Sequence, residues 1–173
     1  MKNVFEIWKD TSPDGFTLRL GKSLTTINNV GTVIILHGRT EFIEKYNEVA
    51  LELNLRGLDV YTMDWRGQGL SDRHLENPQK GHIETFEEYL DDLNWFMKHV
   101  VKKSDRPIIV LAHSMGAHIA ARGLLGGDIR PKSLILLAPM FGIEFGGPTL
   151  IARCIVGFCI RLGLKHRYAF NMG

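Results

Sequence analysis

The segment IIVLAHSMGAHIAARGLLGG, residues 108–127, places one serine between a wholly apolar run and an alanine-rich stretch. The apolar run shows no polar alternation, which is typical of a strand covered on both faces in a parallel sheet. The stretch after the serine has helical character and is finished by Gly126 and Gly127. The sequence therefore predicts a strand ending at Ala112, a sharp turn that carries Ser114, and a helix that begins at Met115.

The residues around Ser114 fit a turn of this kind. AHSMG, residues 112–116, departs from the nucleophile-elbow pattern G-x-S-x-G only at Ala112. The strand and helix backbones lie close together in such a turn, so Gly116 and a small residue at position 112 are favoured. The hydroxyl would then lie at the carboxyl edge of the sheet, near the positive end of the helix dipole. These five residues alone are a weak signal of catalysis, so the rest of the chain has to support it.

Strand-like and helical patterns alternate along the chain. Apolar residues recur at helical spacing from Phe42 to Leu53, with Gly57 as the stop, and Thr85 and Glu88 form a capping box before a second helical pattern over 86–101. Alternation of this kind implies right-handed crossovers and a mostly parallel sheet flanked by helices, which is an α/β fold. The predicted strands cover residues 4–8, 16–20, 32–38, 59–64, 107–112 and 133–138.

Composition excludes several classes of protein. The chain has 173 residues with 45% hydrophobic and 23% charged residues, which is ordinary for a globular domain. Its 21 basic and 19 acidic side chains leave too little net charge to indicate a nucleic-acid partner. Charged residues interrupt the first ten positions, so we expect no signal peptide and a cytoplasmic location. Cys154 and Cys159 form neither a disulfide framework nor a zinc site, and we expect them to be reduced and buried.

The tail changes character after Gly147. Residues 148–164 are apolar with helical spacing but carry Arg153 and Arg161, so the segment is too short and too charged to span a bilayer. Three interpretations stay open: a mobile cap helix, a helix that rests on a lipid surface at the inner face of the membrane, or a partly buried helix without its partner. We expect residues 1–145 to form the N-terminal part of the core and residues 146–173 to begin a cap region.

Five segments, in this order, carry a resemblance to a known family: HGRTEFIEKY (37–46), DWRGQGLSDR (64–73), GHIETFEEYLDDL (81–93), LAHSMGA (111–117) and LAPMFGI (137–143). Over residues 16–145 the chain resembles the α/β-hydrolase family of monoacylglycerol lipases and bacterial lysophospholipases, and it is most similar to the lysophospholipase branch. The resemblance implies an α/β-hydrolase fold and a serine ester hydrolase that removes single acyl chains from glycerol-based lipids. It implies a small lipid or ester as substrate, and neither a metal nor an organic cofactor.

The same resemblance assigns roles to residues. Ser114 is the expected nucleophile, and the backbone N–H groups of Arg39 and Met115 are the expected oxyanion hole. We interpret His37 and Glu41 as braces of the oxyanion loop, and His113 and His118 as packed side chains rather than the catalytic base. A structural loop after the fourth strand is expected to use Asp64, Arg66, Gly67, Gly69 and Ser71.

An acid and a histidine must follow the serine along the chain in this fold. Apart from His118, interpreted above as a packed side chain, the sequence downstream of Ser114 offers only Asp128, at the far end of the predicted helix, Glu144, where the family's cap begins, and His166, with no recognisable strand after it. We therefore expect that the C-terminal strands are missing and that turnover is impaired, because loss of a triad serine or histidine costs about 10⁶-fold in rate. The strand at 133–138 would then be an open sheet edge that favours self-association.

Two alternatives stay open from the sequence. The chain could be a catalytically silent α/β-hydrolase scaffold that binds a lipid or a protein partner. It could also be a hydrolase of peptides or small esters, as related serine aminopeptidases are, because the cap selects the substrate in this fold and little of a cap is present.

Overall fold

The structure is a computed structural model that describes residues 3–101, 106–142 and 149–164. These residues fall into two compact units, Met1–Met140 and Phe141–Gly173. The first unit contains the sheet and the predicted site, and the second contains one described helix. The expected boundary between residues 145 and 146 lies in segment 143–148, outside the described residues.

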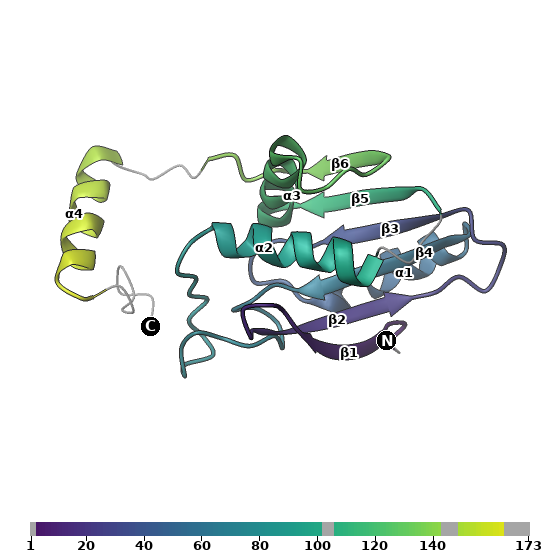
Figure 1. Ribbon diagram of the computed structural model, residues 1–173, viewed down its shortest axis with the longest axis horizontal. Coiled ribbons are helices and arrows are strands. Elements are labelled where there is room, and N and C mark those ends of the chain that lie inside the picture. The colour runs from purple at the N-terminus through teal and green to yellow at the C-terminus, as the bar shows by residue number, and fades with distance from the viewer. Residues whose placement is uncertain (1–2, 102–105, 143–148, 165–173) are drawn as a thin grey trace. The chain divides into compact units, whose positions relative to one another are not determined.

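One mixed sheet organises the first unit, with strand order β1-β2-β4-β3-β5-β6 (Figure 1). β1 and β2 pair antiparallel, β2 pairs antiparallel with β4, and the remaining neighbours pair in parallel. The strands are β1 (Glu6–Thr11), β2 (Thr17–Ser23), β3 (Gly31–Leu36), β4 (Leu58–Asp64), β5 (Ile108–His113) and β6 (Ser133–Leu137). The prediction of a mostly parallel α/β sheet is confirmed.

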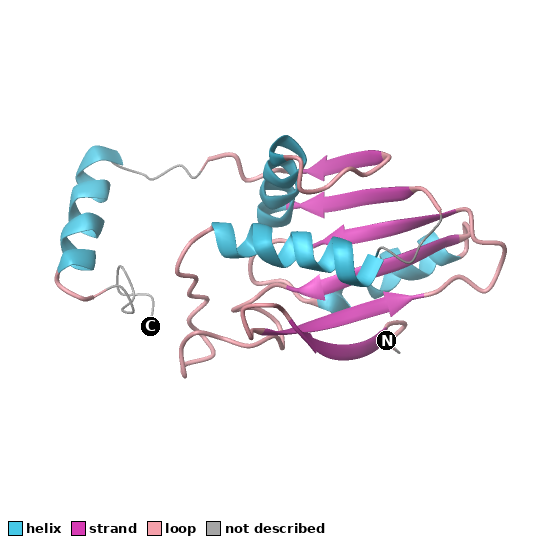
Figure 2. Cartoon of the chain, viewed as in Figure 1, coloured by secondary structure: helices cyan, strands magenta, loops and turns pink. Residues whose placement is uncertain are grey.

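Helices cover both faces of this sheet (Figure 2). One face carries the 3-10 turn η1 (Ile43–Tyr46) and α1 (Asn47–Asn54); the other carries α2 (Glu87–Trp95), its π-helical continuation η2 (Phe96–Val101) and α3 (Ser114–Gly126). β3 is buried along its whole length because alternate side chains enter opposite cores. Val33 and Ile35 join the α1 core, whereas Ile34 and Leu36 join the core beneath α2 and α3.

The predicted strands are present with ends that differ by up to three residues, and three local differences have an identifiable basis in the structure. β1 runs over residues 6–11 rather than 4–8, because its antiparallel register with β2 extends to Thr11↔Thr17 beside the connecting turn. The first helical pattern begins as the 3-10 turn η1 before α1. The capping box is half formed: Glu88 accepts a hydrogen bond from the Thr85 N–H at 3.3 Å, but no side chain caps the N-terminus of α2.

The second unit contains α4 (Thr149–Arg161). No helix in the described part of the chain is long and apolar enough to cross a membrane. Both cysteines are free; Cys154 is exposed and Cys159 is partly buried, so the expectation that both are buried is wrong. The reason is that, among the described residues of this unit, no second helix or strand covers α4.

The N-terminal turn of α3 lies directly against the end of β3. A Cβ added to Gly116 would lie 2.5 Å from the carbonyl oxygen of His37 and closer still to that of Leu36. Real Cβ atoms do not approach backbone oxygens this closely, and neither backbone can give way without moving a buried element. Only glycine at position 116 therefore allows α3 to pack this closely against β3.

We expect Gly116→Ala to lower the free energy of unfolding by about 3 kcal/mol, because one methyl group must push α3 away from β3. Urea denaturation measures the change. Gly142→Ala is the control, since a Cβ there meets no atom within 4 Å, and it should stay within about 0.5 kcal/mol of the parent. A Gly116→Ala chain as stable as the control would contradict the close approach.

Candidate active site

Ser114 lies at the junction between β5 and α3. Its φ is +51°, in the left-handed region, whereas His113 before it is extended with φ −117° and ψ 137°. For a residue other than glycine, this backbone conformation costs on the order of 1–3 kcal/mol, and it persists only where the surrounding structure imposes it. The predicted strand, turn and helix are confirmed, with α3 beginning one residue earlier than expected, at Ser114.

The loop after β3 lies against this turn. An ideal Cβ on Gly38 would lie 3.1 Å from both the Ser114 Cβ and the His113 Nδ1. Thr40, two residues further along, also has a left-handed φ, of +60°. The structure therefore brings the predicted oxyanion loop beside the predicted nucleophile, with the exposed Arg39 between Gly38 and Thr40.

The backbone N–H groups on either side of Arg39 already donate hydrogen bonds within the protein, whereas, in the described part of the chain, those of the two predicted oxyanion donors, Arg39 and Met115, do not. The Gly38 N–H donates to Glu41 Oε2 at 2.7 Å, and the Thr40 N–H donates to Gln68 Oε1 at 2.6 Å. Among the residues described, no acceptor takes the N–H of Arg39. Met115 belongs to the first turn of α3, where backbone N–H groups have no carbonyl partner within the helix, and no side chain caps that end.

Gln68 joins three parts of the site. Besides accepting the Thr40 N–H, its Nε2 lies 3.7 Å from the Met115 sulfur and 3.4 Å from the Tyr89 hydroxyl. Only 6% of Gln68 is exposed. Gln68 could not be identified as a site residue from the sequence, because its position within the loop segment 64–73 is the only local signal and its partners are far away along the chain.

Glu41 braces the loop, as predicted. Its carboxylate accepts hydrogen bonds from the Gly38 N–H at 2.7 Å and the Tyr46 hydroxyl at 2.8 Å, and it pairs with Lys45 and with His113 Nδ1 at 3.2 Å. Burial alone would raise the pKa of Glu41, but these donors outweigh it and hold the pKa at about 2. The carboxylate is therefore ionised and fixed at neutral pH, which suits a brace and not a proton carrier.

The histidines near the elbow have structural contacts. His37 is fully buried, with Nδ1 2.7 Å from the Gly38 carbonyl oxygen, and burial lowers the pKa of its imidazole. His118 packs edge-on against Phe86, with ring centroids 5.1 Å apart. Within residues 3–101, 106–142 and 149–164, no histidine nitrogen hydrogen-bonds to Ser114. These contacts agree with the interpretation of His37 as a brace of the oxyanion loop and of His113 and His118 as packed side chains rather than the catalytic base.

The loop after β4 is structural, as expected. The buried carboxylate of Asp64 accepts the backbone N–H groups of Ile43 and Leu70, both at 2.9 Å, and pairs with Arg19 at 3.0 Å. The Ser71 hydroxyl donates to the Asp64 carbonyl oxygen at 2.6 Å. One carboxylate thus ties β2, the start of η1 and the 64–71 loop to the end of β4.

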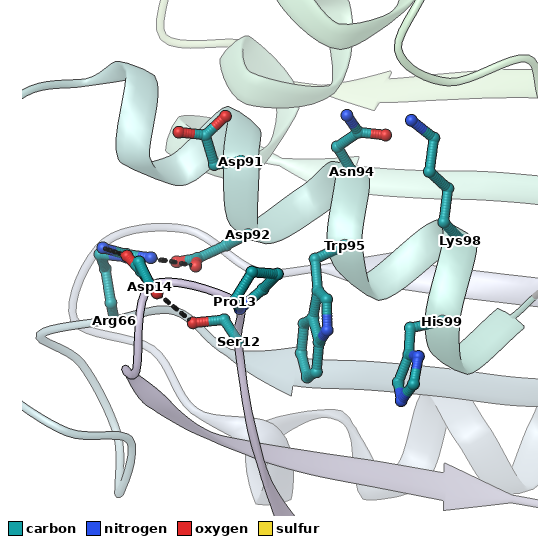
Figure 3. Close-up of a pocket in the computed structure, with 10 residues that line it drawn as sticks. All are labelled: Ser12, Pro13, Asp14, Arg66, Asp91, Asp92, Asn94, Trp95, Lys98 and His99. Carbon is teal, nitrogen blue, oxygen red and sulfur yellow. Dashed lines mark hydrogen bonds and ion pairs between the residues drawn. The ribbon is translucent and has the colours of Figure 1, made fainter.

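Arg66 forms a second buried charge cluster, beside a cavity of about 490 Å³ between the β1–β2 turn and α2 (Figure 3). Its guanidinium donates to the fully buried Asp92 at 2.7 Å and pairs with Asp14 at 2.9 Å and Glu88 at 3.2 Å. This cavity is not lined by Ser114, Arg39 or Met115. In the described part of the chain, no cluster of three or more His, Cys, Asp or Glu side chains could hold a metal ion.

The candidate acids and base downstream of Ser114 are not brought to it. Asp128 lies just beyond the C-terminal end of α3, the far end of a 13-residue helix that begins at Ser114. At a rise of about 1.5 Å per residue, this end is roughly 18 Å away. Glu144 and His166 lie outside the described residues.

A serine on a strained strand-to-helix turn of a mostly parallel sheet, facing the loop after β3, defines an α/β hydrolase. The comparisons with known proteins agree and are more specific. The family model described as serine aminopeptidase, S33 matches residues 28–169, and the chain belongs to this family.

Similar proteins carry lipase names. Lysophospholipase L2 of Escherichia coli K12 is 40% identical over 127 residues, which are 73% of this chain and 37% of that protein. Probable lysophospholipase L2 of Haemophilus influenzae is 36% identical over 142 residues, which are 82% of this chain and 44% of that protein. A soluble variant of monoglyceride lipase from Saccharomyces cerevisiae has a similar fold, with a TM-score of 0.74 at 22% identity, over 91% of this chain and 53% of that one. The chain spans less than half the length of these two lysophospholipases.

The low pKa of Glu41 predicts an acid-sensitive contribution to stability. The folded-state pKa, about 2, lies below the ordinary value of 4.5, so the contribution is fully present above about pH 4.5 and is lost as the pH falls toward 2. We expect Glu41→Gln to cost on the order of 3 kcal/mol at pH 7, with the difference from the parent shrinking below pH 4.5.

Urea denaturation between pH 7 and pH 2.5 checks this dependence. Glu48→Gln, at an exposed position of α1, is the matched control and should change stability by no more than about 0.5 kcal/mol throughout. A Glu41→Gln curve that runs parallel to the parent curve across the whole range would contradict the role of Glu41.

Proposed function

We propose that Ser114 is the nucleophile of a serine ester hydrolase that acts on single-acyl glycerolipids, of the lysophospholipase and monoacylglycerol lipase type. The observation that carries the proposal is the left-handed backbone of Ser114 beside the Gly38–Arg39 loop. The names of the relatives support the substrate class, and one of them is the monoacylglycerol lipase of Mycolicibacterium smegmatis, 33% identical over 156 residues.

The proposed chemistry is acyl transfer through the serine. Ser114 Oγ adds to the ester carbonyl carbon as its proton passes to a base, and the carbonyl oxygen becomes an oxyanion between the N–H groups of Arg39 and Met115. Each donor of this kind is worth about 10²–10³ in rate. The glycerol oxygen then leaves with a proton, and water hydrolyses the acyl-serine to release the fatty acid.

We also propose that the 173-residue chain turns over slowly by itself. In the part of the chain that the structure describes, Ser114 has no histidine within hydrogen-bonding distance, and its hydroxyl is a poor nucleophile without a base. The same observation favours the alternative of a silent scaffold, for which acyl-lipid binding would persist in Ser114→Ala and the parent would hydrolyse nothing.

Two interactions are proposed from the remaining apolar surfaces. β6 is an edge strand in the described sheet, with Ile135 and Leu137 about half exposed, and we propose that it pairs with a second chain. α4 is mostly apolar, with Arg153 and Arg161 as its charged residues, and we propose peripheral contact of segment 148–164 with the inner face of the membrane from the cytoplasm.

The pairing through β6 is tested by size-exclusion chromatography. The chain should elute as a dimer or a larger species, and a stable monomer would overturn the pairing.

The function is tested by fatty acid release from 1-monolaurin and from a lauroyl lysophospholipid, with and without free imidazole. Imidazole can take the Ser114 proton, and since a positioned base is worth about 10²–10⁴ in rate, we expect at least about a tenfold increase. The increase should vanish in Ser114→Ala and persist in Ser133→Ala, a change at an exposed serine where β6 begins. Hydrolysis that is unchanged by Ser114→Ala, or no release from either lipid with imidazole present, would contradict the proposal.

A further inference from the structure

A second cavity, of about 500 Å³, opens beside the oxyanion loop. We call it the loop cavity; Arg39, Thr40, Gln68, Arg73, Gln79 and Gly81 are among the residues that line it. Its wall includes Arg39, which supplies a proposed oxyanion N–H, and Gln68, which links the oxyanion loop to Met115. A ligand in this cavity would therefore lie next to the ester that Ser114 attacks.

Arg39 brings an uncompensated positive charge to the loop cavity. The residue is exposed, and its guanidinium lies over Gly81, where an added Cβ would be 3.7 Å from Nη2. Among the described residues, no carboxylate lies within ion-pair distance of this guanidinium. A planar guanidinium with free N–H groups is suited to bind a phosphate by two parallel hydrogen bonds.

Arg73 adds a second positive charge. Its guanidinium donates to the carbonyl oxygens of Gly67 and, at 2.8 Å, Gly69, and the structure gives it no carboxylate partner in the described ranges. Backbone carbonyls hold the side chain in place without neutralising its charge. Arg73 thus combines a fixed position with a full charge at the wall of the loop cavity.

The acidic residue of the lining does not cancel these charges. Glu41 also lines the loop cavity, but its carboxylate is only 9% exposed and is already paired with Lys45 and hydrogen-bonded to the Gly38 N–H and Tyr46. Amide N–H groups add neutral donors: Gln79 is exposed, and Gln68 has only the long contacts of its Nε2 with Tyr89 and Met115. The lining is rich in donors and carries net positive charge.

We propose that the loop cavity binds the phosphate of a lysophospholipid head group and makes the site prefer phosphate-bearing lipids over neutral monoacylglycerols. The proposal rests on the proposed function for the ester itself. Arg39 holds the phosphate from the loop side and Arg73 from the β4–α2 side, while the glycerol carries the ester toward Ser114. Free phosphate shares this chemistry, so the experiment includes it as a separate ligand.

The test measures binding without hydrolysis, in a Ser114→Ala chain. Isothermal titration calorimetry with 1-lauroyl-sn-glycerol 3-phosphate and with 1-monolaurin, below the concentrations at which they form micelles, should show at least about a tenfold preference for the phosphate lipid. The preference should shrink as salt is added, because exposed charges are screened.

Gly81→Asp is the decisive variant. It places a carboxylate beside Arg39 where the structure has room for a side chain, so we expect the preference to fall to about threefold or less. Gly81→Asn, of the same size but neutral, is the matched control and should keep the preference. Arg39→Gln should lose it, whereas Arg56→Gln, a change in an exposed ion pair just beyond the C-terminal end of α1, should not.

The outcomes separate the two proposals. Equal affinity for the two lipids, or a preference that survives both Gly81→Asp and Arg39→Gln, would overturn the phosphate site. Inorganic phosphate that binds as tightly as the phosphate lipid, in an Arg39-dependent manner, would make the cavity a free-phosphate site and would also overturn it. Failure of Ser114-dependent hydrolysis would overturn only the proposed function, because these affinities are measured without the serine.

Discussion

The contact between the first turn of α3 and the last carbonyl oxygens of β3 governs the geometry of the site. At Gly116 the two backbones are so close that a Cβ has no room. Because α3 packs this closely against β3, the connection from β5 to α3 is a sharp turn at one residue. Ser114 occupies this turn and adopts the left-handed φ of +51° that the connection requires. The serine hydroxyl is thus presented by packing in the core, and not by the flexibility of a loop.

Buried carboxylates extend this constraint to the loops around the serine. Glu41 fixes the turn after β3 through the Gly38 N–H, and Asp64 fixes the start of η1 and the loop after β4. Gln68 then links the two loops to α3. Since ionised carboxylates are costly to bury without donors, each is surrounded by N–H groups and cations, and this satisfied network gives the loop cavity a rigid wall beside the ester site.

The positive charges of the loop cavity follow from the way the other cations are paired. Asp64, Glu41 and Asp92 pair with the nearby cations Arg19, Lys45 and Arg66. Arg39 and Arg73 lie further out on the loops and have no carboxylate partner among the described residues. Arg39 and Arg73 are therefore the cations of this region that can pair with an anionic ligand.

Local sequence was sufficient to predict the features that depend on backbone sterics. The apolar run before Ser114, the small residues at 112 and 116 and the alternation of strands and helices predicted the elbow and the parallel sheet, and the structure has both. Features that depend on distant partners were not predictable in this way. Gln68 acts through residues 40, 89 and 115, the extent of β1 depends on its register with β2, and the exposure of Cys154 depends on which elements cover α4.

The most direct test of the account is a crystal structure of the chain in which Ser114 has been phosphonylated by prolonged exposure to an activated phosphonate ester. The phosphonyl oxygen occupies the place of the oxyanion, and we predict that it lies about 2.7–3.1 Å from the backbone nitrogens of both Arg39 and Met115. A phosphonyl oxygen that faces solvent, beyond about 3.5 Å from both nitrogens, would contradict the claim that the seating of α3 on β3 builds an oxyanion hole.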